Sequence, residues 1–387
     1  MNTQKASFLY VGSDNELYCA YEDMSSLLLS YPFDDYQGAL FPALHLQKQT
    51  AAYFTANRKE KKLALILSDL KGFSLSVACE FELAQPLCLG WSENGTWLAV
   101  LIQRFASQDE SSDRWCELWV VHSSGHSLNV STQERIFFSW AGNDLLLHEK
   151  LVKLNGTVLK IHSLSLSAEA QMLRQQKITY VQEVLSLKGS RFCAPIGLNG
   201  AIYWVEHSFG VSKLLEYRQG ITHVVHSQES FGICSMVACK TGLLFGFMGK
   251  EKSEGYSDLF YYRQTEEKIK NIGCKSIAFL LSDNEECVLL QRDQNNGSFS
   301  WLMIDLRNDM PLWRNEFWPS KEQHFRLQLF EQYSHCASWI QSEHQRLIFS
   351  CYEHRPALKG PNTHWITSID MVSGEQKKMF KGHFVAC

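Results

Sequence analysis

The hydrophobic positions of this chain recur in short pairs of apolar segments, each pair separated by a polar or glycine-containing turn. In the clearest pair, WSENGTWLAVL (91–101), the turn is Asn94-Gly95. Asn-Gly between apolar segments is a strong signal for a β-hairpin. Related pairs occur at WAGNDLLL (140–147), IGLNGAIYW (196–204), CKTGLLFGF (239–247), LLSDNEECVLL (280–290) and WIQSEHQRLIF (339–349). The pattern predicts a repeated antiparallel β unit.

A third apolar segment follows each pair, and a weaker fourth segment usually follows the third. The third segments are ELYCAY (16–21), KLALIL (62–67), ELWVVH (117–122), VLKIHS (158–163), KLLEYR (213–218), DLFYYR (258–263), WLMIDL (301–306) and WITSID (365–370). The period-2 patterning and the Gly, Asn, Asp and Ser residues in the turns are typical of β-strands and tight connections. Each unit is therefore predicted to be a four-stranded meander.

The spacing of these units predicts the architecture. The turns between the first and second strands fall near positions 6, 50, 95, 144, 200, 242, 285 and 344, with a mean interval of about 48 residues, within the range of propeller repeats. We therefore predict an all-β fold, a β-propeller of four-stranded antiparallel blades, in which residues 1–387 form a single domain. Eight blades fit the spacing best, and seven is the alternative because the first two units are the least regular.

The two ends of the chain complement each other in this scheme. FLYV (8–11) resembles a second strand without a first partner, and KGHFVAC (381–387) falls where another first strand would begin. A closed ring of blades leaves no end face of the assembly unpaired. We therefore expect the N- and C-terminal segments to pair and to close the ring.

Two other fold classes fit the sequence less well. A two-domain β-sandwich gives no reason for a constant repeat length. An α/β fold requires long segments of 3.6-residue periodicity, and the best helical candidate is the short SAEAQMLRQQK (167–177). The propeller remains the predicted fold.

Composition and charge narrow the classes of partner. The chain has 37 basic and 41 acidic residues, a net charge of −4 and a pI of about 6.4, so it lacks the excess of clustered cations that nucleic-acid binding requires. No apolar run approaches the roughly 18 residues of a membrane-spanning helix. The N-terminus has no long apolar core of a signal peptide, and the twelve cysteines include no CxxC pair. We predict a cytoplasmic protein that binds neither nucleic acid nor membrane.

The segment LGWSENGTWLAVL, followed by ELWVVHSSGH, resembles the WD40-like repeats of TolB-type propellers and of the propeller domain in prolyl-oligopeptidase-type peptidases. DLFYYRQTEE and ITSIDMVSGEQ resemble further copies. The resemblance covers most of the chain as a repeat pattern, and it implies the fold rather than an activity. The chain departs from TolB-type proteins by lacking a leader and from true WD40 repeats by lacking the WD dipeptide.

Catalytic chemistry finds little support in the sequence. The peptidases of the resembled family need a hydrolase domain with a G-x-S-x-G nucleophile turn, and this motif is absent, so serine peptidase activity is not expected. His223 and His226 are three positions apart in one strand, so their side chains point to opposite faces. His122 and His126 straddle a turn, but no carboxylate or thiol is spaced to act as a third metal ligand. We predict no metal and no cofactor, and we leave open whether the protein is an enzyme.

The predicted binding surface is the rim where the second strand of each blade ends. Interleaved acidic and basic residues recur there, and three long connections at 106–115, 251–258 and 353–363 leave second strands at the same face; long loops often carry function. The candidate binding residues are Arg104, Trp115, Glu206, His207, Tyr256, Arg292, Glu353, His354 and Arg355.

Two functions are compatible with this surface. The first is a non-catalytic scaffold that binds a protein or peptide partner through one rim and the long loops. The alternative is an enzyme or small-molecule binder whose site lies at the mouth of the central channel and draws residues from several blades. A deep pocket with convergent acids, bases or histidines would favour the second.

Overall fold

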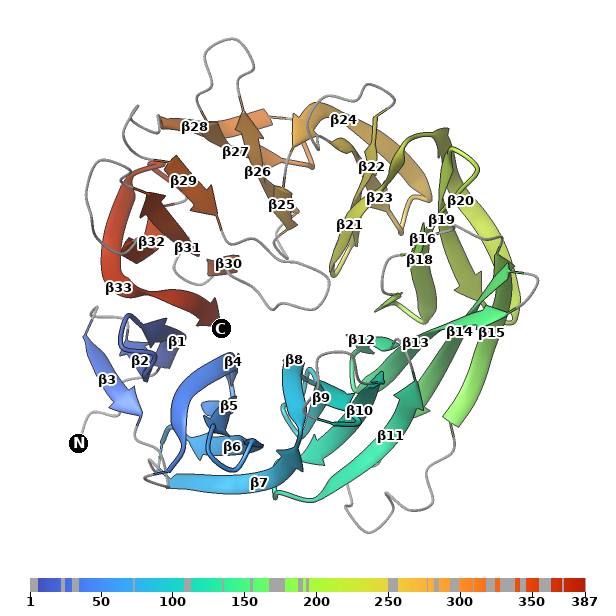
Figure 1. Ribbon diagram of the computed structural model, residues 1–387. Coiled ribbons are helices and arrows are strands. Elements are labelled where there is room, and N and C mark those ends of the chain that lie inside the picture. Colours follow the sequence, from blue (N-terminus) through green and yellow to red (C-terminus); the bar gives the residue numbers. More distant parts are fainter. Residues whose placement is uncertain are drawn as a thin grey trace.

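The alternating segments of the sequence form antiparallel strands that pair into sheets, and the sheets are arranged around a common centre as a β-propeller (Figure 1). The computed structural model describes residues 6–21, 25–29, 35–71, 74–107, 113–133, 136–153, 156–166, 178–186, 191–192, 195–249, 257–276, 278–281, 285–292, 299–308, 310–317, 324–327, 338–341, 346–354, 363–370 and 372–386. The helical candidate at 167–177 lies outside these residues.

Three of the sheets come from the first half of the chain. The first contains β4 (Gln37–His45), β5 (Thr50–Asn57), β6 (Lys62–Asp69) and β7 (Ser74–Glu82). The second contains β8 (Ala84–Trp91), β9 (Trp97–Phe105), β10 (Arg114–His122) and β11 (Ser127–Gln133). The third contains β12 (Ile136–Ala141), β13 (Asp144–Lys153), β14 (Gly156–Ser165) and β15 (Ile178–Ser186).

Three more sheets follow in sequence order. The fourth contains β16 (Arg191–Phe192), β17 (Ile196–Leu198), β18 (Ala201–Ser208), β19 (Val211–Arg218) and β20 (Ile221–Glu229), with β16 and β17 both paired to β18. The fifth contains β21 (Gly232–Cys239), β22 (Gly242–Met248), β23 (Ser257–Arg263) and β24 (Lys268–Ser276). The sixth contains β25 (Ala278–Leu281), β26 (Glu286–Arg292), β27 (Phe299–Asp305) and β28 (Met310–Phe317).

The two ends of the chain form one larger sheet instead of separate blades. It contains β1 (Ala6–Gly12), β2 (Leu17–Tyr21), β3 (Ser26–Leu29), β29 (His324–Leu327), β30 (Ser338–Gln341), β31 (Arg346–His354), β32 (Thr363–Asp370) and β33 (Gln376–Ala386). The described residues therefore form six sheets of four or five strands and one sheet of eight strands. Among the described residues, the sheets do not divide into the eight separate four-stranded blades that the spacing predicts, nor into the alternative seven.

The long strand β33 is the physical reason for this difference. Its first part, from Gln376 to Lys381, pairs with β32, and its second part, from Gly382 to Ala386, pairs with β1. The ring of Phe380 also stacks on that of Tyr10, with a centroid distance of 4.7 Å. The strand is therefore shared by the N- and C-terminal segments, which lie side by side in Figure 1.

Neighbouring sheets are joined by apolar packing and by repeated indole hydrogen bonds. Trp91 Nε1 donates to the carbonyl of Ala43 at 3.3 Å, and Trp140 Nε1 donates to the carbonyl of Gly90 at 2.8 Å. In both cases a tryptophan near the end of a first strand reaches the first strand of the preceding sheet. The equivalent place of the two residues in WSENG and WAGND explains why this phrase recurs.

The Asn94-Gly95 turn is fixed both locally and by its neighbours. Gly95 has φ of 65°, and a Cβ there would lie 2.8 Å from ring atoms of His45, so glycine is required by conformation and by space. The backbone N–H of Glu93 donates to the carbonyl of Gly142 at 3.2 Å. The turn therefore also connects the second sheet to the third.

Candidate functional site: a groove between two sheets

A solvent-open groove of about 390 Å³ lies between the first sheet, β4–β7, and the second sheet, β8–β11. Its lining residues are Lys62, Glu80, Phe81, Glu82, Arg104, Glu117 and Trp119, and we call this set the rim groove. Lys62 begins β6, Glu82 ends β7 and Arg104 lies near the end of β9. The groove is therefore at the rim where second strands end, which is the face that carries the candidate residues.

Strand alternation places three residues of β10 in a row, and two of them, Glu117 and Trp119, line the groove. Trp115, Glu117 and Trp119 are two positions apart, so their side chains lie on the same face of the sheet. The two indole N–H groups donate to the carboxylate between them, Trp115 Nε1 to Glu117 Oε1 and Trp119 Nε1 to Glu117 Oε2, both at 3.0 Å. This carboxylate holds both tryptophan rings in fixed orientations.

Arg104 links this row of residues to the neighbouring sheet. Its Nε lies 3.4 Å from Glu117 Oε1, and its Nη1 donates to the backbone carbonyl of Glu82. The side chains of Arg104 and Glu117 are 26% and 12% exposed, so the pair is partly shielded from solvent. Arg104 therefore neutralises Glu117 and connects β9 to β7.

The floor of the groove is aromatic. Phe81 is buried, and its ring contacts the edge of the Trp119 ring with a centroid distance of 5.5 Å and an interplanar angle of 69°. Phe81 contacts Phe54 in a similar edge-on arrangement. Such edge-to-face contacts contribute about 0.5–1.5 kcal/mol beyond the buried area, and they fix the position of Trp119.

The opposite wall carries carboxylates. Tyr36 donates its hydroxyl to Glu80 Oε1 at 2.6 Å, and burial together with this hydrogen bond raises the pKa of Tyr36 to about 12. Lys62 Nζ lies 2.8 Å from Glu60 Oε2. Glu60, and at longer range Glu80 and Glu82, raise the pKa of Lys62. The electrostatic potential at the groove is therefore negative around its one lysine.

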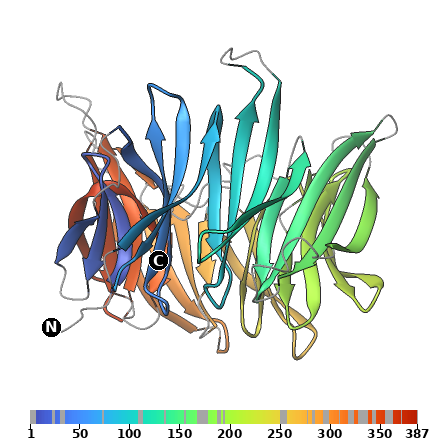
Figure 2. The same ribbon diagram turned by 90° about the horizontal axis from the view of Figure 1, so that it is seen from below.

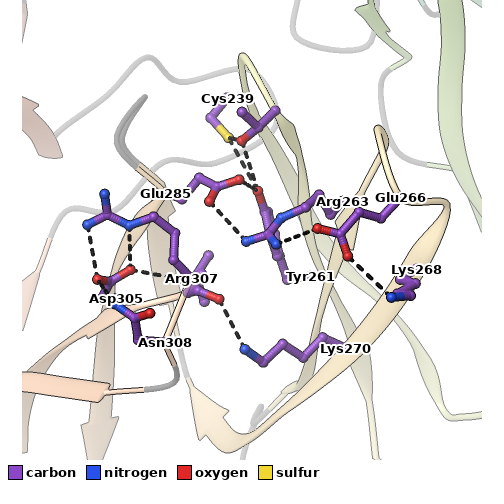
Figure 3. Close-up of polar contacts among 12 residues, drawn as sticks. Cys239, Tyr261, Arg263, Glu266, Lys268, Lys270, Glu285, Asp305, Arg307 and Asn308 are labelled. Carbon is purple, nitrogen blue, oxygen red and sulfur yellow. Dashed lines mark hydrogen bonds and ion pairs between the residues drawn. The ribbon is translucent and has the colours of Figure 1, made fainter.

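A second polar cluster joins two other sheets at the opposite rim. Tyr261, Thr241 and Arg263 of the fifth sheet meet Glu285, which directly precedes β26 of the sixth sheet, and we call these four residues the polar junction (Figure 3). Because Gly242 begins β22 and Glu286 begins β26, this junction lies where second strands begin. The groove lies where they end.

Hydrogen bonds satisfy the Glu285 carboxylate within the polar junction. Tyr261 Oη donates to Glu285 Oε1 at 2.9 Å, and Arg263 Nη2 lies 3.0 Å from Glu285 Oε2. Burial raises the pKa of Glu285, but the hydrogen bonds from Thr241 and Tyr261 and the charge of Arg263 outweigh it, so the pKa lies below its ordinary value. Arg263 also pairs with Glu266 at 2.8 Å. The junction is a closed charge network with little exposed surface on its central carboxylate.

The structure separates the other candidate residues from the groove. Glu206 and His207 lie near the end of β18 in the fourth sheet, where Ser208 Oγ donates to Glu206 Oε1 at 3.3 Å. His207 Nδ1 lies 3.0 Å from Ser212 Oγ, and Ser212 is fully buried and also bonds the carbonyl of Gly232. A buried, hydrogen-bonded serine cannot reach a substrate. This histidine–serine contact is therefore structural.

The remaining candidates lie at or beyond the limits of the described chain. Arg292 is the last residue of β26, and Glu353 and His354 are the last two residues of β31. Their strands end at the same face as β9. Tyr256 and Arg355 lie outside the described residues. Of the nine candidates, the structure joins two, Arg104 and Trp115, which both contact Glu117.

Sequence reasoning missed six groove residues: Lys62, Glu80, Phe81, Glu82, Glu117 and Trp119. A local signal existed for two of them. In RWCELWVVH, Trp115, Glu117 and Trp119 alternate with buried Cys116 and Leu118, which places an acid between two tryptophans on one face. No local signal places Phe81 and Glu82 opposite them, because that contact depends on how two sheets pack.

The described residues also bear on metal binding and membrane insertion. Within the part of the chain that the structure describes, no three His, Cys, Asp or Glu side chains converge as a metal site. His122 and His126 both contact Ser124 Oγ, at 2.7 and 3.0 Å. In the same described part, no helix has the length and apolar character needed to cross a bilayer.

Comparisons with known proteins agree with the propeller fold. A prolyl endopeptidase, from a study of inter-domain dynamics in catalysis and specificity, matches with a TM-score of 0.50 and 12% identity over 89% of this chain. This chain spans about half, 51%, of that protein. The β-propeller domain of the Trilobed protease from Pyrococcus furiosus matches with a TM-score of 0.47 and 12% identity, over 88% of this chain and 97% of that one.

An oligogalacturonate lyase in complex with manganese matches with a TM-score of 0.48 and 9% identity, over 95% of this chain and 83% of that one. No family model and no curated protein matches the chain. The resemblance to propellers of prolyl-oligopeptidase-type proteins is thus confirmed as a resemblance of fold. At this identity it says nothing about activity.

Proposed function

We propose that this propeller binds a peptide segment of a partner protein in the rim groove. The single observation that carries the proposal is a groove of about 390 Å³ between two sheets, with an aromatic floor and charged walls. Peptide-binding sites combine such aromatic anchors with a polar rim. The hydrogen bonds of Glu117 to both tryptophans hold the floor in place before a ligand arrives. Preorganisation of this kind reduces the entropy lost on binding.

The architecture supports the proposal by providing a frame for the groove. We propose that the eight-stranded sheet comprises two blades that share β33, so that the chain forms eight repeat units in one domain and β33 closes the ring. The pairing of β33 with both β32 and β1 supports this count. A ring closed by hydrogen bonds offers a rigid frame for the loops and grooves at its rim.

A peptide-display selection tests the proposed function. A random peptide library is selected on the intact protein, and the enriched peptides are measured against the variant Trp119→Ala. We expect affinity to fall at least about tenfold, because truncation of an aromatic anchor in a groove removes 2 kcal/mol or more. The matched control is Ile221→Ala, on the exposed strand β20 and 58% exposed, which should bind normally.

Stability must be separated from binding in this test. Trp119→Phe keeps an aromatic ring against Phe81 and removes only the indole hydrogen bond to Glu117, so it should fold and bind with intermediate affinity. Peptides that bind all three variants equally well would refute the groove as the site. A small-molecule or catalytic site at the channel mouth would then become the better hypothesis.

A further inference from the structure

We propose that the rim groove accepts the side chain of an arginine from its partner. The inference rests on the proposed function and names the chemistry of the ligand. Three observations support it: an excess of carboxylates, an aromatic surface beside them, and an acceptor carboxylate that is not already used.

The charge balance of the groove is negative. Glu60, Glu80, Glu82 and Glu117 face the two cations Lys62 and Arg104. Arg104 is matched by Glu117 and Lys62 by Glu60, at 3.4 and 2.8 Å. Among the described residues, no cation forms an ion pair with Glu80 or Glu82: both act on Lys62 only at longer range, and Glu80 accepts the Tyr36 hydroxyl. A cationic ligand would complete this arrangement, and an anionic one would be repelled.

Glu82 is the carboxylate with free capacity. Its backbone carbonyl accepts from Arg104, and among the described residues none donates a hydrogen bond to its side chain. The residue is exposed and ends β7 beside the groove. A carboxylate can accept two parallel N–H bonds from a guanidinium. Glu82 can therefore bind an incoming arginine without giving up a bond inside the protein.

The aromatic floor favours arginine over lysine. Trp119 is partly exposed and is held by Glu117 and by the Phe81 ring. A planar guanidinium stacks on an indole while it forms a bidentate contact with a carboxylate, whereas an ammonium group is a strongly hydrated point charge. The carboxylates of the groove wall and the Trp119 indole therefore match a guanidinium better than an ammonium group.

The probes for the test are two labelled hexapeptides, Gly-Ser-Arg-Gly-Arg-Ser and the same sequence with citrulline in place of arginine. Citrulline keeps the shape and removes the charge. Fluorescence anisotropy at low ionic strength should show saturable binding of the arginine peptide and binding of the citrulline peptide that is at least about tenfold weaker. A lysine version should bind with intermediate affinity.

The variant Glu82→Gln should weaken binding of the arginine peptide about three- to tenfold, because it removes a partly exposed ion pair between Glu82 and the peptide. The matched control is Glu375→Gln, an exposed residue in the turn between β32 and β33. It changes the net charge equally and should leave affinity unchanged. An equal loss in both variants would mean that the peptide responds to net charge alone, and it would overturn the inference.

The outcomes separate this inference from the proposed function. Equal binding of arginine and citrulline peptides, together with library peptides that depend on Trp119, would overturn the arginine specificity and leave a peptide-binding groove. Peptides of every kind that bind independently of Trp119 would overturn both. Loss of binding with citrulline and with Glu82→Gln, but not with Glu375→Gln, is the result we expect.

Discussion

The rim groove and the polar junction solve the same structural problem in different ways. Both join neighbouring sheets, and both contain an arginine paired with a glutamate of an adjacent strand or sheet. In the polar junction, Glu285 receives donors from Tyr261 and Arg263 and is 8% exposed. In the groove, Glu117 is satisfied in the same manner, but Glu80 and Glu82 extend into solvent beside it.

The difference indicates which charges hold the fold and which remain available. A buried carboxylate with several donors is costly to disturb because its partners lose their bonds in a poorly solvated place. An exposed carboxylate with no partner contributes little to stability. Glu82 is such a carboxylate and therefore has no evident role in folding, whereas Glu80 accepts the Tyr36 hydroxyl. Figure 2 shows the propeller from the side, with the strands running between its two faces.

The largest expected effect is at the polar junction. Arg263→Met should lower the free energy of unfolding by about 2 kcal/mol, because the substitution leaves the buried Glu285 carboxylate without its cation. Equilibrium urea unfolding followed by circular dichroism measures the change. Glu375→Gln serves as the control and should unfold like the unchanged protein. An effect no larger than that of the control would show that the junction is not a stabilising network.

The pH dependence of stability should also come from the junction. The pKa of Glu285 is lowered in the folded protein, so its contribution is fully present above the unfolded value of about 4.3 and is lost as the pH falls through the folded pKa. The stability difference between the protein and Glu285→Gln should therefore shrink below about pH 4.3. Urea midpoints measured from pH 3 to pH 7 test this. A difference that stays constant over that range would contradict the assignment.

The equivalent change in the groove should cost less. Arg104→Met should lower the free energy of unfolding by about 1 kcal/mol, since Glu117 keeps its two indole donors and the lost ion pair is partly exposed. The same urea experiment gives the ratio of the two arginine effects. If Arg104→Met proves as destabilising as Arg263→Met, the Arg104–Glu117 pair stabilises the fold as much as the polar junction does.

The smallest stability effect is expected at Glu82. Glu82→Gln should change the free energy of unfolding by less than about 0.5 kcal/mol, as for most exposed positions. Its effect on the affinity for the arginine peptide should nevertheless be larger than its effect on stability. This loss of affinity should diminish in 1 M salt because exposed charges are screened. Salt-independent loss of affinity would point to altered shape of the groove instead of lost charge.

The fold could be predicted from the sequence further than the site. Strands begin at Ala6, Thr50, Trp97, Asp144, Ala201, Gly242, Glu286 and Arg346, at or shortly after the turn positions in the sequence. This succeeded because hairpin turns and period-2 patterning are local signals. The number of separate sheets could not be predicted correctly, because one continuous strand, β33, pairs with residues from both ends of the chain.

The site shows the same division between local and long-range information. Arg104 and Trp115 are adjacent across β9 and β10, so hairpin pairing was enough to place them near one another at the rim. The contacts of Arg104 with Glu82 and of Trp119 with Phe81 depend on the packing of two sheets, which no repeat pattern specifies. Residues such as Glu206 and His207 share the pattern but lie in another sheet. Recurrence at the rim therefore cannot distinguish them from the groove residues.

The most direct test of the account compares two isosteric changes, Glu82→Gln and Glu285→Gln, in two measurements on each protein. The measurements are the urea unfolding midpoint and the affinity for the arginine hexapeptide. We predict that Glu82→Gln loses affinity about three- to tenfold with an unchanged midpoint, and that Glu285→Gln lowers the midpoint with unchanged affinity. Loss of affinity in both variants or in neither would contradict the assignment of the groove to binding and the polar junction to stability.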